Sequence, residues 1–249
     1  MNVTRTLFVV DGSSLEPASR LAALDAASLA TALDRDGCAL VPELLDAAEC
    51  AALAALYEHE QRFRSRVVMS RHGYGRGEYR YFCNPLPPVV QALRASLYAL
   101  LVPIANQWHE RLRIDVRFPA THGEFLARCH AAGQIKPTCL LLSYGPGDYN
   151  CLHQDIYGEH VFPLQATVLL SRPQTDFGGG EFVMTEQRPR MQSRPFVVSL
   201  TQGTAVIFAV RHRPVQGTRG DYRVNLRHGV SRVTSGLRRT LGVILHDAR

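Results

Sequence analysis

The chain contains almost no lysine and no paired cysteine motif. Of its 28 basic residues only Lys136 is a lysine, and the other 27 are arginine. The six cysteines are irregularly spaced without a CxxC pair, which excludes the common thiolate metal-site patterns and favours reduced thiols in a cytoplasmic protein. No run of about 18 apolar residues is present, and the apolar stretch at 7–10 is too short for a secretory signal. We therefore expect a globular protein without a membrane span.

The arginines are concentrated in two stretches. Six lie between residues 187 and 220 without an acidic residue, and six lie between residues 62 and 80 beside one acid, Glu78. Such richness in arginine can reflect a GC-rich genome, and the stretches can be solvated loops. They can also form docking surfaces, because guanidinium groups bind phosphate and carboxylate with two hydrogen bonds. Arg76 and Arg190 are our candidate contacts to a polyanion.

The 249 residues, of which 46% are hydrophobic, are sufficient for one large core, and no repeat or linker divides them. We expect a single domain, 1–249, in which a mainly helical portion at 1–136 precedes a β-rich core at 137–249. Residues 1–17 have no strong pattern and predict a loose or edge segment. Residues 62–87, with glycines among arginines and tyrosines, predict a functional loop or an irregular hairpin. Periodicity and capping residues predict helices at 18–36, 46–60, 88–101, 103–112 and 123–132.

After Pro137 the chain changes to short apolar runs that are rich in β-branched and aromatic residues and separated by turn residues. Seven such runs at this spacing indicate a β-sandwich or barrel, so the expected fold class is α+β. The runs predict strands at 139–144, 162–171, 181–185, 196–200, 205–210, 230–233 and 240–246.

His153 and Asp155, together with the distant His228, form the strongest candidate metal site. An iron(II) oxygenase needs two histidines and a carboxylate on one face of the metal, because the other positions must stay open. Residues at i and i+2 of a strand point to the same face, and the turn-rich segment 144–150 before them indicates the mouth of a barrel. An HxD pair alone is common by chance, so the sequence that follows His228 decides the prediction.

That sequence predicts a dicarboxylate cosubstrate. Arg238-Arg239-Thr240 starts the last expected strand, and strand alternation places Arg238 and Thr240 on one face and Arg239 on the other. A 2-oxo acid that chelates iron at one end needs a buried cation for its far carboxylate. Arg238 can supply a bidentate, charge-assisted pair worth roughly 1.5–3 kcal/mol. The Thr240 hydroxyl can add a hydrogen bond, and Tyr144 can reach the same carboxylate.

The other histidines fit the third metal position less well. His212 lies in an arginine-rich turn, and the next strand offers another histidine in place of an arginine. His246 has no strand after it. His130 and His160 have no patterned partner and are typical of capping or surface positions.

At these residues the chain resembles the 2-oxoglutarate/iron(II) dioxygenase superfamily, whose fold is a double-stranded β-helix, or jelly roll. The resemblance covers roughly residues 137–249. Segment 141–155, LLSYGPGDYNCLHQD, is similar to the YxPG…HxD signature of AlkB-like nucleic-acid demethylases. Segment 177–182, FGGGEF, is similar to the GGE turn of prolyl-4-hydroxylase-like members. His228-Gly-Val and Gly236-Leu-Arg-Arg-Thr240 match the distal histidine and the Arg-x-Ser/Thr anchor of both branches.

The resemblance implies Fe(II), 2-oxoglutarate and O2, with Tyr144 and Arg238 as cosubstrate ligands. The sequence as a whole also resembles a bacterial group of oxygenases that is placed near AlkB. AlkB-like enzymes carry an acidic, base-reading residue two positions after the iron aspartate, where this chain has Tyr157, and an asparagine where it has Leu142. Both departures concern the substrate and leave the core chemistry unchanged.

For the substrate we predict alkylated or otherwise modified nucleic acid, single-stranded or damaged, with Tyr157 as a candidate base contact. The arginine stretch at 62–80 combines charge for phosphates with aromatic rings for stacked bases. A hydroxylase of a protein side chain or small metabolite is the alternative, favoured by the GGE turn. A third alternative is a non-catalytic metal or 2-oxoglutarate sensor that docks on nucleic acid.

Overall fold

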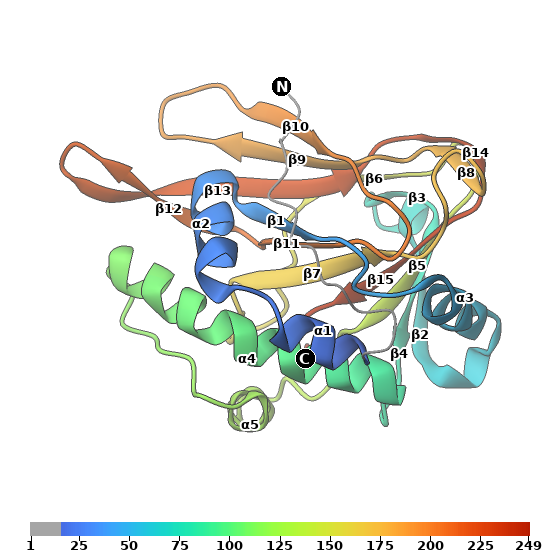
Figure 1. Ribbon diagram of the computed structural model, residues 1–249, viewed down its shortest axis with the longest axis horizontal. Helices are drawn as coiled ribbons and strands as arrows, with labels where there is room; N and C mark the ends of the chain where they lie inside the picture. Colours follow the sequence, from blue (N-terminus) through green and yellow to red (C-terminus); the bar gives the residue numbers. More distant parts are fainter. Residues whose placement is uncertain (1–15) are drawn as a thin grey trace.

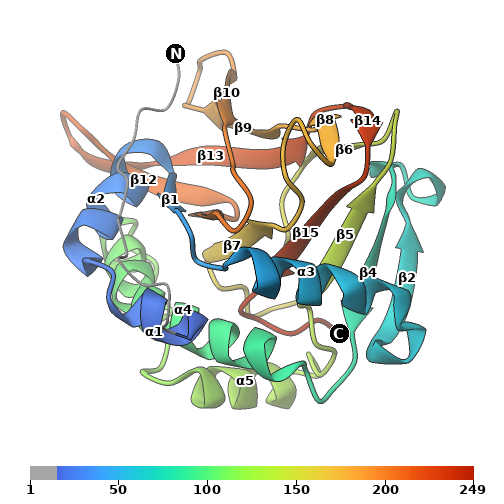
Figure 2. The same ribbon diagram turned by 45° about the vertical axis from the view of Figure 1, so that its right-hand side comes forward.

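The computed structural model describes residues 16–249 (Figure 1). The apolar stretch at 7–10 and nearly all of the segment 1–17 that was expected to be loose lie outside the described residues. Two antiparallel sheets face each other, and helices cover the outer side of one of them (Figure 2). Within residues 16–249 the sheets form a sandwich and do not close into a barrel. The α+β class with a jelly-roll core is confirmed.

The larger sheet carries most of the core. Its strands are β1 (Cys38–Val41), β2 (Phe63–Val68), β4 (Glu78–Phe82), β5 (Leu140–Tyr144), β7 (Leu164–Leu169), β11 (Ala205–Ala209) and β15 (Arg238–Val243). They are ordered β1-β11-β7-β15-β5-β4-β2. The facing sheet contains β3 (Gly75–Arg76), β6 (Tyr149–His153), β9 (Phe182–Gln187), β10 (Arg194–Val198), β12 (His212–Gly217) and β13 (Gly220–Val230). Its order is β10-β9-β13-β6-β3, with β12 beside β13, and a small third sheet pairs β8 (Phe177–Gly179) with β14 (Val233–Gly236).

Side-chain caps start three of the five helices in the described chain, and the other two begin at a proline. They are α1 (Pro17–Ala22), α2 (Ala26–Asp36), α3 (Ala47–Ala55), α4 (Pro88–Arg111) and α5 (His122–Ala131). The region expected as one helix at 18–36 is two helices, because Asp25 accepts hydrogen bonds from the N–H groups of Ala27 and Ser28 and starts α2. Asp46 caps α3 as predicted, in a capping box with Glu49.

Helix α4 is continuous where two helices were expected on either side of Pro103, which lies inside it. Proline removes one backbone hydrogen bond, but the buried side of α4, including Tyr98 and Trp108, keeps the helix against the core. By length and composition alone α4 is apolar enough to cross a membrane, although Gln91 and Arg94 interrupt its apolar residues. Half of its most apolar stretch is buried inside the protein, as in a core helix.

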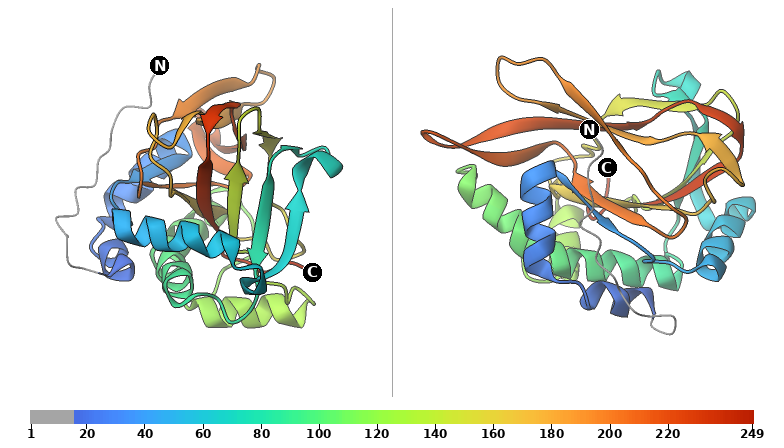
Figure 3. Two further views of the ribbon diagram at one scale, coloured as in Figure 1. Left: turned by 90° about the vertical axis from the view of Figure 1, so that its right-hand side faces the viewer. Right: turned by 45° about the horizontal axis from the view of Figure 1, so that its top comes forward.

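The N-terminal portion is mainly helical, as predicted, but it also contributes strands to both sheets (Figure 3). β1 pairs with β11, and β4 pairs with β5. Residues 62–87, predicted as a loop or irregular hairpin, form the β2–β4 hairpin, whose register shifts between Phe63 and Ser65. β3, between these strands, joins the other sheet at β6. The segment therefore connects the two layers at one side of the sandwich.

The region between residues 211 and 236 was predicted wrongly. His212 was expected in a turn and a strand was expected at 230–233, whereas β12 and β13 form a long hairpin and β14 begins at Val233. In β13, Val224, Leu226 and His228 are buried and the residues between them are exposed. This is the alternation of a half-buried strand. Arginines on its exposed face made the segment resemble a loop.

Candidate metal centre and cosubstrate pocket

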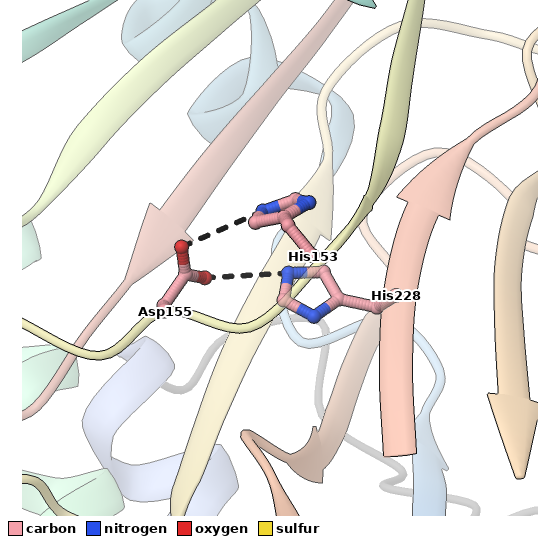
Figure 4. A group of neighbouring side chains, drawn as sticks. All are labelled: His153, Asp155 and His228. Carbon is pink, nitrogen blue, oxygen red and sulfur yellow. Dashed lines mark ion pairs between the residues drawn. The ribbon is translucent and has the colours of Figure 1, made fainter. Parts of the chain in front are cut away.

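The three predicted ligands come together between the sheets. His153, Asp155 and His228 each place a ligand atom within 4.8 Å of the others (Figure 4). His153 ends β6 and His228 lies in β13, where the two are direct partners in the antiparallel register. Asp155 forms ion pairs with both: His153 Nε2 lies 3.5 Å from Oδ1, and His228 Nε2 lies 3.3 Å from Oδ2.

Asp155 reaches this position differently from the prediction. Strand alternation was expected to point His153 and Asp155 to one face, but β6 ends at His153 and Asp155 follows it in irregular backbone. The intervening Gln154 donates from Nε2 to the carbonyl oxygen of Leu226 in β13 over 2.7 Å. This bond ties the segment after β6 to the strand that carries His228.

The electrostatics of the triad suit a divalent metal ion. Burial opposes ionisation of Asp155, but the two histidines hold its pKa well below the usual value. Burial and the nearby His153 lower the pKa of His228. Burial lowers the pKa of His153 too, but Asp155 outweighs that effect and the net shift is upward. His153 Nδ1 donates to the carbonyl oxygen of Cys151 over 2.8 Å, which leaves Nε2 toward Asp155. Two imidazoles and one carboxylate so arranged fit iron(II).

A cavity of about 390 Å³ lies beside the triad. Cavities of this size hold small organic ligands. Residues of both sheets and of the segment after β6 form its walls, so the cavity is a product of the sandwich and not of one loop. Its polar lining includes Tyr144, Asn150, Tyr157, Gln165, Arg238 and Thr240.

Arg238 is a buried cation in this cavity with unused hydrogen-bonding groups. It is 1% exposed, and its Nε and Nη1 have no hydrogen-bond partner in the described part of the chain. Its guanidinium lies 5.6 Å from the ring centre of Tyr144 and 5.9 Å from that of Phe177. Burial lowers its pKa to about 10, so it remains charged at neutral pH. A buried, unpaired charge is unfavourable, and a ligand carboxylate such as that of 2-oxoglutarate would complete the site.

Arg239 points away from the cavity. Its Nη1 donates to the carbonyl oxygen of Ala54 over 2.8 Å, and its Nη2 lies 2.5 Å from a carboxylate oxygen of Glu58. Thr240, two residues after Arg238, lines the cavity with it. The alternation predicted for this strand is therefore observed.

The three residues predicted to contact substrate lie in different surroundings. Tyr157 lines the cavity, but its hydroxyl donates to Asp155 Oδ1 over 2.5 Å, and burial together with the Asp155 charge raises its pKa. Arg76 and Arg190 are exposed and do not line the cavity. Arg76 lies 4.0 Å from Asp148.

The histidines that were rejected as metal ligands lie outside the triad. His212 begins β12 and lines a separate hollow. His246 is fully buried, and its Nδ1 accepts a hydrogen bond from the N–H of Phe162. His130, expected to be a capping or surface residue, is exposed, and its Nε2 lies 2.9 Å from a carboxylate oxygen of Asp247.

Two polar cavity residues were not predicted. Gln165 donates from Nε2 to Asp155 Oδ2 over 2.6 Å, and Asn150 donates weakly to the Tyr144 hydroxyl over 3.4 Å. Gln165 is the one amide in the mostly apolar strand predicted at 162–171, which is observed as β7 (Leu164–Leu169). A lone amide in such a run needs a buried hydrogen-bond partner, and that signal was available in the sequence.

A family of oxygenases, described as catalysing oxidative methylation of damaged DNA, matches residues 77–248. The chain belongs to this family. The match begins well before residue 137, where the motif resemblance began, and includes β4, α4 and α5. The uncharacterised proteins MT2286 and Rv2227 of two Mycobacterium tuberculosis strains are 48% identical over 167 residues, which are 67% of this chain and 72% of theirs.

Two solved structures share the fold of this chain. A Pseudomonas putida prolyl-4-hydroxylase has a TM-score of 0.53 and 17% identity over 90% of this chain and all of that one. A Burkholderia pseudomallei oxidoreductase of the 2OG-Fe(II) oxygenase family has a TM-score of 0.52 and 18% identity over 98% of each chain. The family match, the triad and the buried Arg238 together identify the protein as a dioxygenase that uses Fe(II), 2-oxoglutarate and O2, and these neighbours share its fold.

Proposed function

We propose that this dioxygenase demethylates or otherwise repairs alkylated or modified nucleic acid in the cytoplasm. The observation that carries the proposal is the family match over residues 77–248, which include the triad and Arg238, because that family is described as acting on damaged DNA. The proposal assigns Fe(II) to His153, Asp155 and His228, and the far carboxylate of 2-oxoglutarate to Arg238, Thr240 and Tyr144.

Iron(II) and 2-oxoglutarate, when bound, would with O2 supply the oxidation of a substrate C–H group to an alcohol, which on an N-methyl group breaks down to formaldehyde. The chain supplies binding and orientation. Arg238 neutralises the far carboxylate, and the rings of Tyr144 and Phe177 lie beside its guanidinium. Burial of these groups between the sheets excludes water, which strengthens each charged contact.

Aromatic side chains in the cavity favour a planar substrate. Tyr74 is 50% exposed and also lines the cavity, so it is accessible from outside. Deeper inside, the rings of Tyr79 and Tyr81 meet edge to face with centroids 5.3 Å apart. A base must leave its stack to reach an enzyme's reactive centre, and stacking on an aromatic ring stabilises it by roughly 1–3 kcal/mol. This lining supports a flipped base as the substrate.

The exposed arginines support a polyanionic partner, although fewer are free than the sequence suggested. In the first stretch Arg66 pairs with Glu78, and in the second Glu186 binds three arginines at once. A remaining set is exposed and has no acidic partner closer than 4.0 Å among residues 16–249. That set comprises Arg62, Arg71, Arg76, Arg113, Arg117, Arg190, Arg211, Arg219, Arg223, Arg227 and Arg232.

We predict that single-stranded DNA binding depends strongly on salt. Each phosphate contact should contribute about 0.7 to the log–log slope of affinity against salt on a single strand, or about 0.9 on a duplex. Arg76→Ala and Arg190→Ala should each reduce the slope by about one contact, because both side chains are exposed. Fluorescence anisotropy of a labelled oligonucleotide across a salt series measures this slope.

Arg35→Ala is the matched control, because Arg35 is equally exposed but pairs with Asp36 on α2. Its slope should equal that of the wild type. Turnover of 2-oxoglutarate without substrate should stay unchanged in Arg76→Ala and Arg190→Ala. A flat salt dependence in all four proteins would contradict the nucleic-acid proposal.

A hydroxylase of a protein side chain or small metabolite is the second candidate, favoured by the Gly178-Gly-Gly-Glu181 turn that resembles the prolyl-4-hydroxylase-like branch. In the structure Gly179 and Gly180 have φ values of 67° and 65°, and a Cβ on Gly180 would lie 2.8 Å from Cδ of Arg238. The glycines of this turn therefore leave space for the Arg238 side chain. Both the demethylase and the hydroxylase candidate need that arginine. Formaldehyde release from methylated oligonucleotides separates the candidates, since only a demethylase produces it.

A further inference from the structure

The carboxylate of Asp155 is held from both sides by uncharged donors. The Tyr157 hydroxyl donates to Oδ1 over 2.5 Å, and Gln165 Nε2 donates to Oδ2 over 2.6 Å. The two histidines of the triad approach the same two oxygens. Each oxygen therefore has one neutral donor and one histidine, and rotation of the carboxylate would break a bond at both oxygens.

These donors are themselves rigidly placed. Gln165 is 4% exposed and lies in β7 opposite Phe208 of β11, and its Oε1 has no hydrogen-bond partner in the described chain. Its amide also lies 3.5 Å from His228 Nε2. The side-chain amide of Gln165 therefore makes its polar contacts only with the triad in the described chain. This is unusual for a buried side chain whose role is packing alone.

Tyr157 is fixed through its backbone. Gln134, which is fully buried, donates from Nε2 to the carbonyl oxygens of Tyr157 and His160, each over 3.1 Å, and to that of Asp247 over 2.6 Å. Its Oε1 accepts from the N–H of His160. The segment after Asp155 is thus tied to the C-terminal segment, and the Tyr157 hydroxyl has little freedom to turn toward a substrate.

We propose that Tyr157 and Gln165 are positioning residues that hold the Asp155 carboxylate toward the two histidines, so that the Tyr157 hydroxyl serves the metal site and does not read the substrate. The inference rests on the proposed assignment of Asp155 as a metal ligand. An oriented ligand binds metal more tightly because less freedom is lost on binding, and loss of an outer partner typically weakens a metal site about 10–100-fold. The position that reads the base in AlkB-like enzymes then has a different task here.

The test is metal affinity, measured by calorimetry with Co(II) in the absence of oxygen, 2-oxoglutarate and nucleic acid. Tyr157→Phe removes only the hydroxyl, and Gln165→Met keeps the length of the side chain without its donor. We expect each to weaken Co(II) binding at least tenfold and to change the visible absorption spectrum of the bound Co(II). Tyr74→Phe is the matched control, because the same atom is removed in the same cavity without a bond to Asp155; its Co(II) affinity should equal that of the wild type.

The thermal midpoint of the metal-free variants shows whether they fold. If Tyr157→Phe and Gln165→Met fold normally and bind Co(II) as tightly as the wild type, the inference is wrong. Asp155→Ala distinguishes that result from failure of the ligand assignment itself. If Asp155→Ala loses Co(II) while the other two variants keep it, the assignment stands and the positioning role fails. If Asp155→Ala also keeps Co(II), the assignment fails and the inference fails with it.

Discussion

The Asp155→Ala variant is expected to bind no iron(II) and to form no succinate from 2-oxoglutarate, whereas the wild type should form succinate slowly even without substrate. The reason lies in the arrangement of the three groups. Asp155 is the one carboxylate of the triad, and it faces both histidines from 3.3 and 3.5 Å. Its removal leaves two imidazoles, which do not meet the need of iron(II) for three protein ligands. Anaerobic iron titration and succinate release measure the two effects.

His153→Ala should also lose iron(II) binding and succinate formation, since its Nε2 is fixed toward Asp155 by the hydrogen bond from Nδ1 to the carbonyl oxygen of Cys151. His212→Ala is the matched control, because this histidine was considered as a ligand but begins β12 away from the triad. Its turnover should match that of the wild type. Full succinate formation by Asp155→Ala, or loss of it in His212→Ala, would overturn the ligand assignment.

The meeting of the three candidate ligands could be predicted from the sequence because few residue types can bind iron and the third ligand must come from a distant part of the chain. His153, Asp155 and His228 meet between the sheets as expected. The argument for their common face was partly wrong, since Asp155 lies beyond the end of β6. The chemistry restricted the choice of residues more strongly than the expected secondary structure did. For this reason the three residues were chosen correctly although the expected strand boundary was wrong.

Partners that depend on long-range pairing could not be predicted. The sequence gives no sign that Glu186 would bind Arg188, Arg194 and Arg213 together, because β9, β10 and β12 must first assemble. The same holds for the bond from Tyr157 to Asp155, which requires the backbone to leave the strand between them. An exposed charge and a buried ion pair look alike in a sequence. The size of the basic surface was therefore overestimated.

Arg238→Ala should raise the dissociation constant for 2-oxoglutarate at least tenfold, a loss of about 1.4 kcal/mol or more. The guanidinium is fully charged, buried and without a hydrogen-bond partner at Nε and Nη1 in the described chain, so a bound carboxylate would supply the missing contacts. Calorimetry with Mn(II) in place of iron measures binding without turnover. Metal affinity should change little, because Arg238 contacts no member of the triad by a hydrogen bond or ion pair in the described chain.

Arg239→Ala is the matched control on the same strand. Arg239 binds the carbonyl oxygen of Ala54 and the carboxylate of Glu58, which lie at the end of α3 and just after it. Its loss should lower the free energy of unfolding by loosening α3 from β15, and it should leave 2-oxoglutarate binding unchanged. The two variants thus separate a ligand-binding effect from a stability effect at neighbouring positions. If Arg239→Ala weakens 2-oxoglutarate binding more than Arg238→Ala does, then the face of β15 that reaches the cosubstrate is the opposite one, and the pocket assigned to its far carboxylate is wrong.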